Sequence, residues 1–247
     1  MEKFVKNKKI IIVGPSRSTL THLTKEFVDS HDIVVRVNAS PDTTLIHGEK
    51  IGYRCDILYH CLNEDLGYGD VINTELLKKL NTKFLIHKPK LVNEKAINCI
   101  PDGVDINKLN ILSTFLNIKM IDTTFYNNFS NKINTRPNTG FIAIFDLLIY
   151  NPEEIYITGY TFSMDGYISG YKNDKLIKRN KKIYNYDITN IDLPAFNSKR
   201  HIKNNMVNFL KESIKNDKRI KVDNILKKIL SLDNLNIDKE TLEYIFN

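Results

Sequence analysis

The chain has 247 residues, 42% of them hydrophobic, and a formal net charge of +7 at pH 7. This length and composition exclude a disordered chain or a small disulfide-rich domain, and they predict one large domain with its own core. Three cysteines are too few for a disulfide framework or a cysteine-based metal site. No signal peptide is visible, and no run approaches the roughly 20 apolar residues that cross a bilayer. We therefore expect a cytoplasmic protein.

Short apolar runs alternate along the chain with segments of helical pattern. Continuous runs of β-branched residues are typical of buried parallel strands. The predicted strands are residues 9–13, 32–37, 55–59, 83–87, 155–158 and 220–222. The predicted helices are residues 20–28, 72–80, 141–150 and 201–214, with two more within 223–247. The alternation predicts a single Rossmann-like α/β/α domain with a mainly parallel sheet.

The first two strands each end in polar residues. The first continues into a turn that holds Gly14, Ser16 and Arg17 but lacks the spacing of a dinucleotide fingerprint or a P-loop. The turn is therefore either a plain strand-to-helix connection or a nucleotide contact. The second strand ends at Asn38, whose amide suits a ribose or a base, although asparagine is also common in turns. Arg36 within that strand is expected to pair with a carboxylate.

The segment Arg136 to Gly140 precedes the most apolar predicted helix. Free N–H groups at a helix start bind anions, and Thr139 followed by Gly140 lets a phosphate or carboxylate approach closely. Arg136 matches either anion in a bidentate manner. Asn138 or Thr139 could instead serve only as the helix N-cap, and that use is compatible with anion binding.

Two further segments follow this helix. The strand 155–158 brings Gly159, Tyr160 and Thr161 to the edge of the sheet where α/β proteins bind ligands. His201 opens an amphipathic helix, whose dipole disfavours the charged imidazole. A neutral histidine there can act as a general base near neutral pH, and a surface or capping histidine is the alternative.

Together and in this order, the segments resemble the sialyl motifs of sialyltransferases, glycosyltransferase family 29. The matching stretches are residues 13–16 and 27–38 for the large motif, 136–160 for the small motif and 201–222 for the very small motif. The Arg-x-x-Thr-Gly pattern is also similar to the bacterial sialyltransferases of family 42. In all, the resemblance covers residues 9–60 and 133–223.

The resemblance implies an enzyme that transfers sialic acid or a related keto-sugar from a CMP-sugar donor to a glycan hydroxyl, with inversion and without a metal or other cofactor. It implies a single domain over residues 1–247, with the acceptor side at 62–132 and closing helices at 224–247. His201 would be the base. Arg136, Tyr184 and Tyr186 would assist at the phosphate, for which Tyr167 and Tyr171 are further candidates.

The resemblance also implies a donor site. Its residues would be Gly14, Ser16, Arg17, Asn38, Asn138, Thr139, Gly140, Gly159, Tyr160 and Thr161. No Asp-x-Asp motif of the metal-dependent glycosyltransferases is present in the sequence.

Three departures from the family pattern stand out. Pro15 occupies the place of an asparagine in the animal enzymes, and the cysteine pair that links their large and small motifs has no counterpart. The missing disulfide fits a cytoplasmic microbial or viral protein. Met206 stands five residues after His201, where the family usually carries an acid.

Other functions stay open at this point. The chain could use a different nucleotide-sugar donor, or it could be a non-catalytic glycan-binding or nucleotide-binding module on the same fold, as Pro15 and Met206 would favour. A phosphotransferase should show a glycine-rich lysine loop, and none is evident. No basic-aromatic pattern predicts nucleic-acid binding. The basic runs at 6–9 and 178–182 leave contact with a membrane surface open, and the oligomeric state is undetermined.

Overall fold

The computed structural model describes residues 1–62, 71–101, 104–171, 201–235 and 238–246. Its centre is a seven-stranded sheet in the order β7-β4-β3-β2-β1-β8-β9, in which every neighbouring pair is parallel. The strands are β1 (Lys9–Val13), β2 (Ile33–Val37), β3 (Ile57–His60), β4 (Phe84–His87), β7 (Asn117–Met120), β8 (Glu154–Thr158) and β9 (Ile220–Val222). The predicted α/β fold with a parallel sheet is therefore confirmed.

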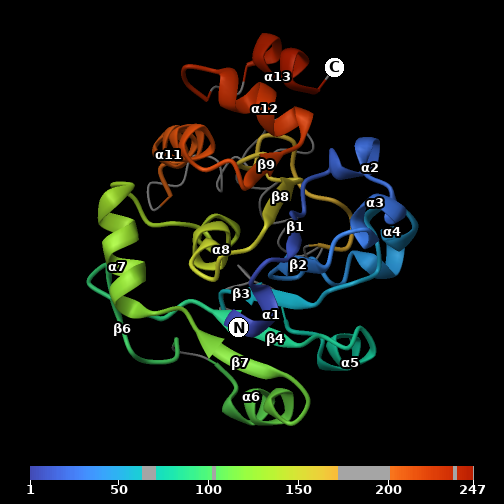
Figure 1. The fold of residues 1–247 in the computed structure, drawn as a ribbon, viewed down its shortest axis with the longest axis vertical. Helices are drawn as coiled ribbons and strands as arrows, with labels where there is room; N and C mark the ends of the chain where they lie inside the picture. The colour runs from blue at the N-terminus through green and yellow to red at the C-terminus, as the bar shows by residue number, and fades with distance from the viewer. Residues whose placement is uncertain (63–70, 102–103, 172–200, 236–237, 247) are drawn as a thin grey trace, which may run out of the picture.

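Helices cover both faces of this sheet (Figure 1). Before the middle of the chain come α1 (Glu2–Val5), α2 (Thr19–His22), α3 (Lys25–Asp29), α4 (Thr44–Ile51), α5 (Thr74–Lys79) and α6 (Ile106–Ser113). They are followed by α7 (Thr123–Lys132), α8 (Thr139–Leu148), α11 (Lys203–Asn216), α12 (Asn224–Ser231) and α13 (Lys239–Phe246). Helices α7, α8 and α11 lie on one side of the sheet in Figure 1, and α3 and α4 on the other.

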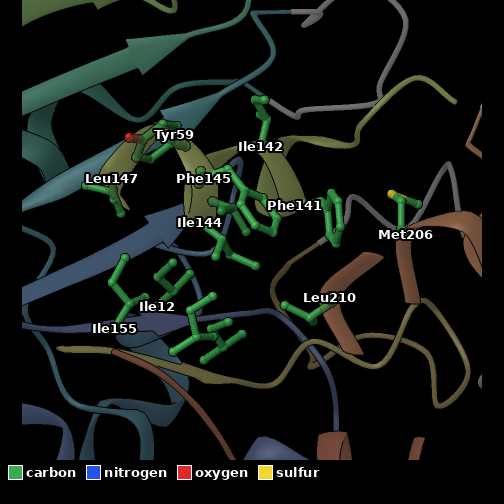
Figure 2. Close-up of a cluster of buried hydrophobic side chains, with 14 of the residues drawn as sticks. Ile12, Tyr59, Phe141, Ile142, Ile144, Phe145, Leu147, Ile155, Met206 and Leu210 are labelled. Atoms are coloured by element: carbon green, nitrogen blue, oxygen red, sulfur yellow. The ribbon is translucent and has the colours of Figure 1, made fainter. Parts of the chain in front are cut away.

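The main core lies between the sheet and α8 (Figure 2). From Thr139 to Leu147 every residue of this predominantly apolar helix is buried, and the carboxylate of Asp146 accepts a hydrogen bond from the Tyr59 hydroxyl at 2.6 Å. Met206 and Leu210 of α11 are fully buried beside it. The position at which the family usually carries an acid is therefore a core position here, and methionine fits it because an unpaired carboxylate could not be buried there.

The predicted helix 20–28 is wrong as a single element. Helix α2 ends at His22, Leu23 is extended, and α3 begins at Lys25. The reason is Thr24, whose hydroxyl accepts a hydrogen bond from the Phe27 N–H at 3.2 Å and so caps a new helix.

Among the described residues, Arg36 does not have the carboxylate partner that we expected. Its guanidinium is fully buried and donates to backbone carbonyls at the end of α4, at 2.8 Å from Ile51 and 2.7 Å from Gly52, and to that of Arg54 at 2.7 Å. Burial lowers the pKa of Arg36 to about 10. The cation thus satisfies the C-terminal carbonyls of a helix, which attract positive charge.

Between residues 71 and 132 the structure contains more than the predicted helix and strand. An antiparallel hairpin of β5 (Lys90–Val92) and β6 (Lys95–Ile97) follows β4, and α6, β7 and α7 come next. Strand β7 is the sheet edge, and none of its four residues is fully buried. An edge strand need not be a continuous apolar run, so the pattern that located the central strands did not locate this one.

Candidate active site

The order of the sheet reverses between β1 and β8. From β1 the chain builds outward through β2, β3, β4 and β7, then returns to place β8 on the other side of β1. Ligands of open α/β sheets bind beyond the carboxyl ends of the strands at such a switch point. The predicted donor-site residues that follow β1 and β8 are at this place, where the two strand ends lie side by side.

Gly14 and Gly159 bring these two strand ends into contact. A Cβ atom on Gly14 would lie 2.1 Å from the carbonyl oxygen of Gly159, and one on Gly159 would lie 2.2 Å from Cγ2 of Thr19. Gly159 also has φ +65°, which favours glycine. Both glycines therefore have a packing role: they let the two chain segments pass closely.

Asp165 joins the segments that follow β1 and β8. Its Oδ2 accepts from the Ser16 hydroxyl at 2.7 Å and from the Ser18 N–H at 2.8 Å. Its Oδ1 accepts from the Thr161 hydroxyl at 2.5 Å. Ser16 and Thr161, both predicted donor-site residues, thus share one carboxylate. Sequence reasoning missed Asp165 because it lies in a loop and matches no motif.

Asn38 and two of the candidate tyrosines come together beside Ser16. The Asn38 backbone has φ +48°, and its side-chain oxygen accepts from the Cys61 N–H at 3.0 Å. Its Nδ2 lies 3.5 Å from the hydroxyl of Tyr171, whose ring centroid is 4.8 Å from that of Tyr167. Tyr167 in turn forms a β-bridge with Ser16. Asn38 therefore has the left-handed backbone conformation that is common for asparagine in turns, and its side-chain amide also lies next to the two tyrosines.

The start of α8 is capped by Asn138. Its side-chain oxygen accepts from the Phe141 N–H at 2.9 Å and from the hydroxyl of Tyr160. The Tyr160 ring lies against Gly140, where a Cβ atom would meet Cε2 at 2.7 Å. Burial raises the pKa of Tyr160 well above its usual value, so the hydroxyl stays protonated. The Asn138 side-chain oxygen therefore accepts hydrogen bonds from two groups of the protein itself. Thr139, which is 6% exposed, is the first residue of the helix.

His201 contacts the loop that precedes α8. Its Nδ1 lies 2.6 Å from the carbonyl oxygen of Arg136, 65 residues away in sequence. A carbonyl only accepts, so Nδ1 carries the proton and Nε2 keeps its lone pair in the neutral ring. Two further bonds tie the start of α11 to the same loop, from the Ile202 N–H to Thr135 Oγ1 at 2.8 Å and from Asn205 Nδ2 to the Asn134 carbonyl at 2.9 Å.

Positive charge surrounds this imidazole. Burial, followed by the charges of Lys88, Lys203 and Arg136, lowers the pKa of His201 to about 3, although the bond to the Arg136 carbonyl opposes the shift. Lys88 follows β4 and Lys203 opens α11, and the two are 9% and 8% exposed. Lys88 directly follows the predicted strand 83–87, and no sequence motif marks it. Its position at a carboxyl end was the one available signal.

The remaining predicted site residues are placed as follows. Arg17 is exposed beside Ser16. Tyr184 and Tyr186 lie outside the described residues, so their predicted role stays a prediction. Within the described part of the chain, no group of three or more histidine, cysteine, aspartate or glutamate side chains could hold a metal ion. No helix among these residues is long and apolar enough to traverse a bilayer.

A cavity of about 760 Å³ lies elsewhere, along β9. It is bounded by α3, β8, α11 and α12, and five lysines are among its lining residues: Lys211, Lys215, Lys218, Lys221 and Lys227. None of the predicted site residues lines it. This cavity is therefore separate from the candidate active site.

Comparison with known proteins bears on the fold. No family model matches the chain, and no curated protein matches it. Among solved structures, a mammalian sialyltransferase in complex with Gal-β-1-3GalNAc-ortho-nitrophenol superposes with a TM-score of 0.51 at 14% identity, over 90% of this chain and 71% of that one. The Campylobacter jejuni sialyltransferase CstII, in complex with the substrate analogue CMP-3FNeuAc, gives 0.49 at 14% identity, over 87% and 78%. The resemblance predicted from the sequence is thus confirmed for the fold.

Proposed function

We propose that this protein is an inverting, metal-independent glycosyltransferase. It moves a sugar, sialic acid or a related keto-sugar, from a CMP donor to a hydroxyl group of a glycan. The fold supports this proposal, since it is the fold of a sialyltransferase, and so does the gathering of motif residues from β1, β2, β8, α8 and α11 at one edge of the sheet.

One observation carries the proposal further than the fold. The bond from His201 Nδ1 to the Arg136 carbonyl joins the segment before α8 to the segment before α11. These are the two segments that resemble the small and very small sialyl motifs. The bond leaves Nε2 as the unprotonated nitrogen, which is what removal of a proton from an acceptor hydroxyl requires.

The roles follow from the chemistry of each group. Nε2 of His201 takes the proton of the attacking hydroxyl. The N–H groups at the start of α8 and the Arg136 guanidinium bind the anionic phosphate or sugar carboxylate and stabilise the charge that develops on the departing CMP. Ser16 and Asn38, with the residues after Gly159, hold the nucleotide, and the hydroxyls of Tyr167 and Tyr171 lie beside them.

The low pKa of His201 has to be considered together with the charge of the bound substrate. A general base works best with a pKa near the working pH, and a pKa of about 3 is low for that task. The charged groups that lower it, Lys88, Lys203 and Arg136, are all cationic. Negative charge on the donor phosphate would offset part of this positive charge and raise the pKa of His201, while the effect of burial remains.

A thermal-shift panel with CMP, CDP, UMP, UDP, GDP and ADP, with and without EDTA, tests the proposal. We expect CMP alone to raise the melting temperature, with no effect of EDTA. Transfer from CMP-sialic acid and CMP-Kdo is then measured on the same protein. Stabilisation by a diphosphate, or a requirement for metal, would overturn the assignment of CMP as the donor nucleotide. Only the similarity in fold to sialyltransferases would then remain.

A further inference from the structure

Lys88 is a buried lysine, and no acidic side chain in the described part of the chain pairs with it. It follows β4 and is 9% exposed. Across the described residues, its ammonium group has no hydrogen bond and no carboxylate partner. Burying an ammonium group without a partner costs several kcal/mol, so lysine is rarely buried unless it is paired. A role in ligand binding explains why a lysine stands here.

Lys88 is near a second cationic side chain and near the proposed base. The guanidinium of Arg136 interacts electrostatically with it, and Lys88 in turn acts on the imidazole of His201. Arg136 Nε is buried and without a hydrogen-bond partner among the described residues. Two cationic side chains from separate loops therefore have unused donors in the neighbourhood of His201, which favours anionic groups on the substrates.

The position of Lys88 indicates which substrate carries that anion. The sheet order puts β3 and β2 between β4 and β1, so the ends of β4 and β1 are roughly 14 Å apart at about 4.8 Å per strand. The proposed nucleotide contacts follow β1, β2 and β8, and the nearest of these strands to β4 is β2, two strands away. Lys88 belongs to the other half of the sheet, built by the segment predicted to form the acceptor side, and it is near the proposed base.

We propose that Lys88 binds a carboxylate, sulfate or phosphate group on the acceptor, so that the acceptor is an acidic glycan, while Arg136 serves the donor. The inference rests on the proposed function, because it names the substrate class of that same site. Lys88 acts here as a specificity-determining residue, since it touches the acceptor away from the reacting hydroxyl.

Binding measurements with matched probes test this directly. Methyl glucuronide and methyl glucoside differ by one carboxylate, and inorganic sulfate supplies an anion without a sugar. With the protein saturated by CMP, we expect the glucuronide to bind at least about tenfold more tightly than the glucoside. Lys88→Met should remove this preference, Lys88→Arg should keep most of it, and Lys95→Met on β6, an exposed lysine, should leave it unchanged.

A second readout separates ligand binding from a structural role. Because the Lys88 side chain is buried and has no partner among the described residues, Lys88→Met should leave the melting temperature unchanged or raise it. CMP affinity should also be unchanged. Equal binding of the two sugars by the unmodified protein, or a Lys88→Met variant that keeps the preference, would overturn the inference. Weakened CMP binding would overturn it too, by assigning Lys88 to the nucleotide.

Failure of the proposed function gives a different result. If CMP does not bind at all, the CMP assignment fails, while the preference for glucuronide over glucoside can still be measured without nucleotide. If sulfate binds as tightly as the glucuronide and Lys88→Met weakens both equally, the site recognises a free anion, and the claim of an acidic glycan acceptor fails.

Discussion

His201 is the residue on which the proposed chemistry depends most. Its ring is oriented by a backbone carbonyl, whereas the sequence resemblance would have supplied an acid five residues later. That place is taken by Met206, which is part of the core. The carbonyl of Arg136 fixes the tautomer of the imidazole, so the ring does not need a carboxylate from α11 for that purpose.

Replacing this imidazole tests the base assignment. His201→Ala should lower the rate of sugar transfer by about 10²- to 10⁴-fold, the usual contribution of a general base. The affinity for CMP, measured by calorimetry, should change little because the base acts on the acceptor hydroxyl. His47→Ala, on α4, is the matched control and should keep full activity. A His201→Ala variant with normal turnover would rule out this role.

Placing an acid at position 206, as in the very small sialyl motif, should destabilise the protein. Met206→Glu would bury a carboxylate among apolar side chains at a position that is 0% exposed. We expect it to lower the free energy of unfolding by about 3 to 5 kcal/mol, as judged from urea denaturation. Met206→Leu, which nearly conserves volume, should lose less than about 1.5 kcal/mol. Equal stability of the glutamate variant would mean that this side chain can reach a polar partner.

At the scale of elements, the loops after β1 and β8 act as one unit. The paired glycines allow contact between the two backbones, and the Asp165 carboxylate holds both loops through three hydrogen bonds. The proposed donor site is thus built on connected loops and does not rest on independent side chains. Ser16 and Thr161 can contact a nucleotide only while Asp165 keeps their positions.

Removing that carboxylate should therefore affect stability and binding together. Asp165→Ala leaves three donors without their acceptor, and bonds to a charged group contribute about 1.5 to 3 kcal/mol each. Because the site is only partly buried, we expect a total loss of about 2 to 4 kcal/mol in the free energy of unfolding and a weaker affinity for CMP. Asp165→Asn should be milder, and unchanged CMP affinity in both variants would separate this loop from the donor site.

At the scale of the whole molecule, the Asp223 carboxylate connects α2 and α12 at the end of β8. His22 Nε2 lies 3.3 Å from Asp223 Oδ2 and 3.0 Å from Thr158 Oγ1. The same carboxylate accepts from the Gly159 N–H at 3.0 Å and from the Leu226 N–H at 2.7 Å, where it caps α12. A single aspartate therefore connects the N-terminal and C-terminal parts of the fold at the end of β8.

This connection gives stability a pH dependence with a definite sign. Burial lowers the pKa of His22, but the hydrogen bond and charge of Asp223 outweigh it and raise that pKa above 6.5. The folded state then binds more protons than the unfolded state, so this contribution is present below pH 6.5 and is lost as pH rises through the folded pKa.

A histidine replacement isolates the effect. Between about pH 6 and 8, His22→Gln should show a smaller fall in the free energy of unfolding than the unmodified protein. Urea denaturation at each pH measures the difference, with His47→Gln as a control. An identical pH dependence in His22→Gln and the unmodified protein would contradict the assignment.

The lowered pKa of His201 acts in the opposite sense and in another window. Its folded value is about 3 against an unfolded value of 6.5, so the unfolded state binds more protons between these limits. Stability from this residue is complete above pH 6.5 and falls as pH drops toward 3.

The central architecture was predictable from local sequence patterns. The runs from Lys9 to Val13 and from Ile33 to Val37 are apolar and β-branched because both faces of a parallel strand are buried. The buried helix after Asn138 and the glycine at the end of β8 were evident for the same reason: local composition reports burial and backbone conformation. These features made the α/β fold and the gathering of polar loops at one sheet edge predictable.

The contacts of the polar side chains could be found only in the folded structure. Arg36 binds helix-end carbonyls, Asp165 unites two loops, Met206 fills the core, and Lys88 joins the cations near His201. These partners are distant in sequence, and hydrogen bonds and charges depend on distance in space, which no local pattern records. The edge strand β7 escaped prediction for a related reason, because exposure removed the apolar run that marks a buried strand.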